Sequence, residues 1–215
     1  MNFKGAIFDL DGTLVNSLED LADSMNSVLS DYHFPTHSLI AYKSFIGSGI
    51  LNLVRVSLPE TVKDKQTIRS YYNQMMDIYS NNCTAKTKPY DGIIFLLNEL
   101  KSRKMKLSVL SNKSDEFTKK IVQELMPDYF DVVMGLKSEA HKKPNPLGAL
   151  QISEDLGISP ENMIYIGDTG IDMQTAQNAK MYGVGVLWGF RTEEELIING
   201  AKKVLNHPMD LIKFL

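Results

Sequence analysis

The chain has 215 residues, of which 43% are hydrophobic and 23% are charged, and its formal net charge is −3. This length is sufficient for one sizeable core, or for a core domain that carries a smaller inserted one. The slightly negative charge disfavours nucleic acid as a partner, and the lack of an apolar stretch near the roughly 20 residues of a transmembrane helix disfavours a membrane.

Short, continuous apolar runs predict strands that are buried on both faces. In chain order these runs are Ala6–Phe8, Leu107–Leu110, Val132–Met134, Met163–Ile166 and Val184–Leu187. Amphipathic stretches of helix length accompany them, at Ile93–Leu100, Phe117–Met126, Leu147–Leu156 and Met173–Ala179. The repeating order of strand and helix predicts an α/β fold with a doubly wound, Rossmann-like and mostly parallel sheet.

The gap after the first predicted strand is far longer than one connection. From about Val15 to Thr84, apolar residues recur with helical periodicity, and no strand-like run interrupts them. We therefore expect residues 15–84 to form an all-helical domain inserted after the first strand. Residues 1–14 and 85–215 would then form the Rossmann-like core.

Two carboxylates, Asp9 and Asp11, leave the first predicted strand just before Gly12. Alternation along a strand would point them to opposite sides, but a glycine lets the chain bend and bring both towards one site. An isolated pair of this kind more often only caps a turn. Its meaning therefore depends on the groups that follow the other strands.

Three such groups occur directly after predicted strands or in their loops. They are Ser111-Asn112-Lys113, Lys143-Pro144, and Gly167-Asp168-Thr169 with Asp172. Open parallel sheets bind ligands at the carboxyl ends of their strands. A phosphate monoester with a divalent cation needs what these ends present: oxygen ligands for a hard ion, donors for phosphoryl oxygens, and a positive charge.

The order of these motifs resembles that of haloacid dehalogenase-type phosphatases, and the likeness covers nearly the whole chain. It is carried by Asp9-x-Asp11-Gly12-Thr13-Leu14, Ser111, Lys143 and Gly167-Asp168-x-x-x-Asp172. Asn112-Lys113 and residues 128–131, 142–146 and 185–191 are most similar to the phosphoglycolate phosphatase branch. The helical insertion resembles the cap domain of that branch.

The resemblance implies a role for each residue of the motifs. Asp9 would attack phosphorus and carry an aspartyl-phosphate, and Asp11 would protonate the leaving group and later activate water. Ser111 and the Asn112 N–H would hold a phosphoryl oxygen. Lys143 would help bind the phosphate, offset charge and steady Asp9.

The implied cofactor is Mg²⁺, with Asp9, Asp168 and the backbone carbonyl of Asp11 as its protein ligands. This arrangement would leave the Asp11 side chain free for proton transfer. Asp172 and Thr13 would lie outside the direct ligands. The expected substrate is a small phosphate monoester, phosphoglycolate-like or a sugar phosphate.

Three other functions stay open. A phosphomutase or a pyrophosphatase of the same superfamily fits the motifs, because hydrolysis and transfer share the phosphoenzyme. A phospho-receiver signalling module also combines clustered acids, Mg²⁺ and an aspartyl-phosphate, but it would leave the long helical insertion unexplained. Dehalogenation would give Asp11 no task, since no alkoxide leaves. The sequence does not specify an oligomeric state.

The chain has a single cysteine, Cys83, which lies among polar neighbours. One cysteine cannot form a disulfide within the chain, which fits a reducing compartment. The first apolar run is short and is interrupted by Asp9, so it does not have the pattern of a secretory signal. We expect a cytoplasmic protein.

Overall fold

The computed structural model describes residues 3–215. The chain divides into two compact units. The larger comprises the described residues up to Asn16 together with Pro89–Leu215, and the smaller is Ser17–Lys88. Among the described residues, no helix is both long and apolar enough to cross a membrane.

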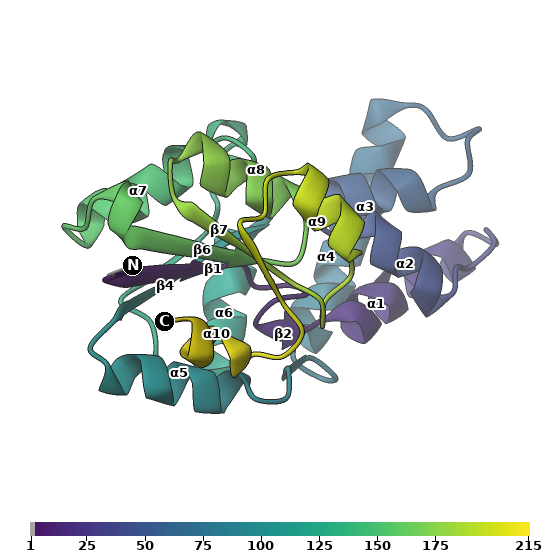
Figure 1. The fold of residues 1–215 in the computed structure, drawn as a ribbon. Helices are drawn as coiled ribbons and strands as arrows, with labels where there is room; N and C mark the ends of the chain where they lie inside the picture. Colours follow the sequence, from purple (N-terminus) through teal and green to yellow (C-terminus); the bar gives the residue numbers. More distant parts are fainter. Residues whose placement is uncertain (1–2) are drawn as a thin grey trace. The chain divides into compact units, whose positions relative to one another are not determined.

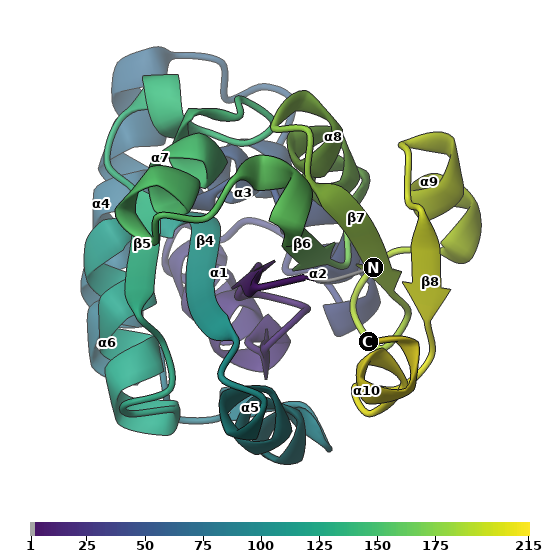
Figure 2. The same ribbon diagram turned by 60° about the vertical axis from the view of Figure 1, so that its left-hand side comes forward.

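The larger unit is built on a six-stranded sheet with the strand order β5-β4-β1-β6-β7-β8 (Figures 1 and 2). Its strands are β1 (Gly5–Phe8), β4 (Lys106–Ser114), β5 (Val132–Leu136), β6 (Met163–Gly167), β7 (Tyr182–Val186) and β8 (Lys203–Leu205). Every neighbouring pair runs parallel. The predicted parallel α/β sheet is confirmed.

Helices cover both faces of this sheet (Figures 1 and 2). Helices α7 and α8 lie on one face and α5 and α6 on the other, while α9 packs beside α8 and α10 beside α5. Burial from both sides explains why the strands are continuous apolar runs in the sequence. The helices are α5 (Ile93–Ser102), α6 (Asp115–Leu125), α7 (Leu147–Asp155), α8 (Gly170–Asn178), α9 (Glu193–Ile198) and α10 (Asp210–Phe214), with short 3₁₀ helices at Glu139–His141 and Pro160–Asn162.

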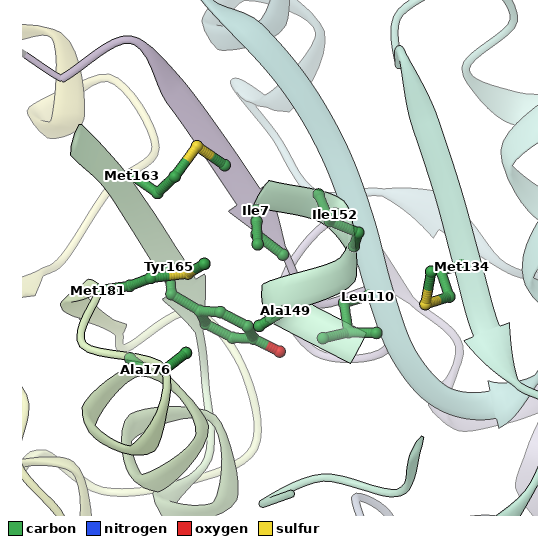
Figure 3. Packing of buried hydrophobic residues seen from close by; sticks show 10 residues of the cluster. Ile7, Leu110, Met134, Ala149, Ile152, Met163, Tyr165, Ala176 and Met181 are labelled. Carbon is green, nitrogen blue, oxygen red and sulfur yellow. The ribbon is translucent and has the colours of Figure 1, made fainter. Parts of the chain in front are cut away.

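A buried cluster joins the central strands to α7 (Figure 3). Ile7 of β1 packs with Ala149 and Ile152 of α7, and all three side chains are fully buried. Met163 and Tyr165 of β6 reach the same layer because they are two residues apart on a strand. This packing fixes β1 and β6, and with them the loops at their carboxyl ends.

The smaller unit is helical, with α1 (Leu18–Asp31), α2 (Leu39–Phe45), α3 (Ile50–Ser57) and α4 (Lys65–Asn82). Helices α1 and α3 each pack against both α2 and α4. One detail differs from the prediction, which expected no strand in residues 15–84: Val15–Asn16 forms the short strand β2, paired with β3 (Lys88–Pro89). Two residues are too few to give a period-two signal.

Asp20, buried in the first turn of α1, bonds the beginning of this unit to its end. Its Oδ2 accepts hydrogen bonds from the backbone N–H of Thr87 at 2.8 Å and from the Thr87 hydroxyl at 2.6 Å. The N–H of Lys86 lies 3.0 Å from both carboxylate oxygens. The first and last segments of the smaller unit are therefore joined through the Asp20 carboxylate.

The strand ends shift by one or two residues from the predicted runs, and two strands, β4 and β8, differ more. β4 continues past Leu110 to Ser114, with a shift in its register against β5 between those residues. An irregularity of this kind lets polar residues continue a strand while their side chains are re-aimed. The edge strand β8 escaped prediction because it has three residues and begins with a lysine, Lys203.

Candidate active site

The predicted site residues lie at the carboxyl ends of three adjacent strands. Asp9 directly follows β1, Ser111 lies in the last part of β4, and Asp168 directly follows β6. β1 lies between β4 and β6. The chain first adds β4 and β5 on one side of β1, and then adds β6, β7 and β8 on the other side. Open α/β sheets bind ligands at such a reversal.

Three buried carboxylates converge there, with oxygens of Asp9, Asp168 and Asp172 within 4.8 Å of one another. Burial, opposed by Lys143 and reinforced by the charge of Asp172, raises the pKa of Asp9 to about 7. Burial and the charges of Asp172 and Asp9 raise the pKa of Asp168 well above its usual range. Carboxylates this close ionise together only where positive charge compensates them.

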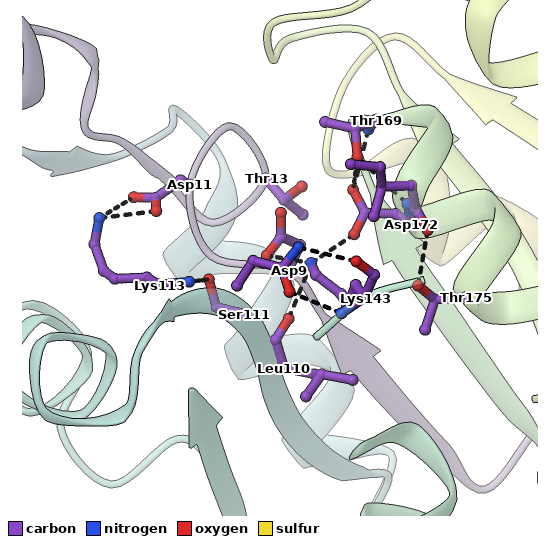
Figure 4. A network of polar contacts seen from close by, with 12 residues as sticks. Asp9, Asp11, Thr13, Leu110, Ser111, Lys113, Lys143, Thr169, Asp172 and Thr175 are labelled. Carbon is purple, nitrogen blue, oxygen red and sulfur yellow. Dashed lines mark hydrogen bonds and ion pairs between the residues drawn. The ribbon is translucent and has the colours of Figure 1, made fainter. Parts of the chain in front are cut away.

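Lys143 supplies one buried positive charge (Figure 4). Its Nζ lies 2.8 Å from Asp9 Oδ1 and 2.7 Å from Asp172 Oδ1, and its side chain is only 2% exposed. Burial alone would lower the pKa of Lys143, but the two carboxylates outweigh it and raise that pKa well above its ordinary value. The ammonium stays charged, yet one positive charge does not balance three carboxylates.

The remaining negative charge fits a divalent cation. Asp9 Oδ1 is buried and accepts no well-aligned hydrogen bond, although the Lys143 ammonium lies 2.8 Å away. Asp168 accepts hydrogen bonds from the Thr13 hydroxyl at 3.2 Å and from the Phe190 N–H at 2.9 Å, one on each oxygen. A compact, oxygen-only donor set with excess negative charge suits Mg²⁺.

Asp172 uses both of its oxygens on protein groups. Oδ1 accepts from the Lys143 ammonium, and Oδ2 accepts from the N–H and hydroxyl of Thr169 at 3.1 and 2.6 Å. Thr169 and Asp172 together form a capping box at the start of α8. A carboxylate engaged in this way orients its neighbours, which is compatible with the outer position that the sequence predicts for it.

Ser111 and Asn112 lie where β4 loses its regular register. The Ser111 hydroxyl accepts a hydrogen bond from the Lys113 N–H at 3.2 Å. The Asn112 side chain accepts from the Lys143 N–H at 2.8 Å and donates to the Lys143 carbonyl at 3.3 Å. The sequence predicts a role only for the Asn112 backbone, whereas the structure adds that its side chain anchors Lys143.

The Asp11 carboxylate is engaged with Lys113 (Figure 4). Lys113 Nζ lies 2.9 and 2.8 Å from the two oxygens of Asp11. The sequence prediction kept the Asp11 side chain out of the metal ligands, for proton transfer, and gave Lys113 no role. The structure adds a contact that the sequence does not predict, and it brings Lys113 into the group of candidate functional residues.

Two glycines allow the backbone to approach Asp168 closely. Gly12 has a φ of +87°, and a Cβ on it would lie 2.3 Å from Asp168 Oδ2. A Cβ on Gly189 would lie 2.3 Å from the Gly12 carbonyl oxygen. The neighbouring Trp188 indole donates to the Thr13 carbonyl at 2.9 Å. The loop after β7 thus packs against the turn after β1, a contact that no local sequence signal predicts.

A family model for haloacid dehalogenase-like hydrolases matches residues 6–186, and the chain therefore belongs to this family. It is 34% identical to a phosphoglycolate phosphatase of Aquifex aeolicus, over 97% of this chain and 95% of that protein. A phosphoglycolate phosphatase of Psychrobacter arcticus is 32% identical over 88% of this chain and 86% of its own. A solved structure from Lactobacillus delbrueckii subsp. bulgaricus is 30% identical, with a TM-score of 0.89, and covers 100% of this chain and 98% of its own.

Proposed function

We propose that this chain is a Mg²⁺-dependent phosphatase that hydrolyses a small phosphate monoester through an aspartyl-phosphate on Asp9. The observation that carries the proposal is the buried cluster of Asp9, Asp168 and Asp172 around Lys143. The family supports hydrolysis, and the two phosphoglycolate phosphatase relatives support a phosphoglycolate-like substrate.

In the first step the Asp9 carboxylate attacks phosphorus, and the bond from phosphorus to the leaving oxygen breaks. The Lys143 ammonium, 2.8 Å from Asp9 Oδ1, orients this carboxylate and offsets negative charge. Ser111 and the Asn112 N–H donate to phosphoryl oxygens. Mg²⁺, held by Asp9, Asp168 and the Asp11 carbonyl, would reduce the repulsion between carboxylate and phosphate.

Asp11 is the proposed proton donor and acceptor. It gives a proton to the leaving alkoxide and then takes one from the water that attacks the aspartyl-phosphate, which releases phosphate and restores Asp9. General acid and base work of this kind contributes a factor of about 10² to 10⁴. Thr13 and Asp172 keep Asp168 and Lys143 in place through their hydrogen bonds.

Two assignments from the sequence complete the proposal. Residues 15–84 form a cap domain inserted into a catalytic core of residues 1–14 and 85–215. The four helices α1 to α4, which lie within residues 15–84, support this assignment. The compartment is the cytoplasm, which the single cysteine Cys83 supports.

The test is a comparison of kcat/KM for phosphoglycolate, sugar phosphates, nucleotides, pyrophosphate and an aryl phosphate. We expect multiple turnover, with the highest kcat/KM on a small monoester. A single turnover would favour a receiver module, transfer to a second sugar hydroxyl would favour a mutase, and a preference for pyrophosphate would favour a pyrophosphatase. No turnover of any ester would overturn the proposal.

Removal of metal should abolish activity, and Mg²⁺ should restore it, because Asp9 and Asp168 form an oxygen-only cluster. Ca²⁺ should restore activity poorly, since its larger and more flexible shell misaligns the attack. At 100 times its Kd, Mg²⁺ should also raise the free energy of unfolding by about 2.7 kcal/mol. Full activity after exhaustive chelation, with no shift in thermal stability, would contradict the metal site.

Asp11→Asn should slow alkyl phosphates by about 10² to 10⁴, because the leaving alkoxide lacks its proton donor. An activated aryl phosphate needs little help to leave, so its phosphoenzyme should form and then accumulate. Rapid-quench measurement should show a burst of phenol ahead of phosphate. Equal losses on both esters without a burst would show that the proton is handled by another group.

A further inference from the structure

Lys113 is a buried lysine that the proposed reaction does not use. Its side chain is 1% exposed, and its Nζ lies 2.9 and 2.8 Å from the two oxygens of Asp11. Burying an ammonium costs several kcal/mol unless an opposite charge compensates it. The Asp11 side chain, 13% exposed, provides that charge.

The backbone of Lys113 is held on both sides. Its N–H donates to the Ser111 hydroxyl at 3.2 Å, and its carbonyl accepts from the Thr118 hydroxyl of α6 at 3.3 Å. Lys113 also lies between Leu110 and Ser114, where the register of β4 against β5 shifts. The segment that carries the candidate phosphate-binding groups therefore presents Lys113 as a fixed partner for Asp11.

An ionised carboxylate has about four lone-pair positions on its two oxygens. The Lys113 ammonium takes one position on each oxygen of Asp11 and so leaves the carboxylate able to exchange a proton. An ammonium can thus restrict the rotation of this side chain without blocking its chemistry. Contact with both oxygens favours one rotamer of the Asp11 side chain, which directly precedes the Gly12 turn.

We propose that Lys113 is a positioning residue, which acts on the reaction only through Asp11 by holding both carboxylate oxygens in place. This inference rests on the proposed proton-transfer role of Asp11. It assigns Lys113 a different task from Lys143, which contacts Asp9 and Asp172 instead. Because Lys113 works through a proton-transfer group, its loss should change kcat and leave KM nearly unchanged.

The test is a double-mutant cycle with Lys113→Met, Asp11→Asn and the variant carrying both changes. Lys113→Met should lower kcat on the order of tenfold to a hundredfold, since misplacing a catalytic group costs up to about 10². On an aryl phosphate it should give a weaker form of the phenol burst expected of Asp11→Asn. In the Asp11→Asn background it should change kcat by less than about twofold, since residues acting as a unit are not additive.

Two further variants serve as controls for the double-mutant cycle. Lys119→Met removes the exposed ion pair of Lys119 with Asp115, 2.7 Å long, and should leave kcat at the wild-type value. Lys113→Arg should recover most of the lost rate, because a guanidinium can bind both oxygens of a carboxylate. If Lys113→Met melts below the assay temperature, Lys113→Gln, whose amide donates to Asp11, takes its place in the cycle.

If the fold-losses in kcat of Lys113→Met and Asp11→Asn multiply in the double variant, the proposal is overturned, because Lys113 then acts independently of Asp11. A wild-type kcat for Lys113→Met would overturn it as well. Asp11→Asn by itself reports on the proposed function. If that variant keeps the wild-type rate, the role of Asp11 fails together with the role of Lys113, whereas multiplied losses remove the role of Lys113 alone.

Discussion

Asp9→Asn is expected to lose at least about 10³-fold in turnover, as removal of a nucleophile does, and to keep or raise thermal stability. The amide cannot attack phosphorus. Burial raises the pKa of Asp9 to about 7, so near neutral pH the folded, metal-free protein holds an ionised Asp9 at a cost in free energy. The neutral amide removes this cost, and Lys143 keeps Asp172 as its partner.

Steady-state kinetics and thermal melting in chelator measure the two effects. Asp155→Asn, a matched change on the exposed end of α7, should alter neither. Substantial turnover by Asp9→Asn would exclude Asp9 as the nucleophile. A clearly lower melting temperature would instead show that Asp9 stabilises the metal-free fold.

Lys143→Met is expected to remove activity and also to destabilise the fold. It leaves Asp9 and Asp172 buried beside each other without the ammonium that lies within 2.8 Å of both. Breaking a buried ion pair by removing one partner costs roughly 3–5 kcal/mol. Urea unfolding of the metal-free protein should show a loss of this size.

The adjacent Lys142 offers a matched control. Its ion pair with Glu139 is 3.7 Å long and lies at the surface, with side chains 33% and 81% exposed. Lys142→Met should therefore cost less than about 1 kcal/mol. Adding Asp172→Asn to Lys143→Met should recover part of the lost stability, since one uncompensated carboxylate is removed. Equal stability of the Lys142 and Lys143 variants would contradict a structural ion pair.

The positions of the acidic groups could be predicted because they depend on strand ends. The apolar runs before Asp9, Ser111 and Asp168 mark strands buried on both faces, and parallel strands present their carboxyl ends at one edge. The parallel direction of the strands follows from the same repeating pattern of strand and helix. These features need only local sequence and the rules of parallel sheets.

The contacts that connect these groups could not be predicted. Lys113 and Asp11 are 102 residues apart, and Asn112 and Lys143 are 31 apart. Which side chain meets which depends on the register shift in β4, and no hydrophobic periodicity encodes a shift among polar residues. A lysine next to a candidate phosphate-binding segment is therefore indistinguishable in sequence from a solvated one.

The hydrogen bonds of Asp20 affect how much the length of the smaller unit can change. Because it bonds the first turn of α1 to Lys86 and Thr87, the intervening segment is a closed excursion whose ends are already joined. The entropy of closing a loop grows slowly with length, by about 0.6 kcal/mol for each doubling. Insertions or deletions between Asp20 and Lys86 should therefore add little to the entropy cost of closing this segment, and they need not alter the strand ends that carry the candidate site.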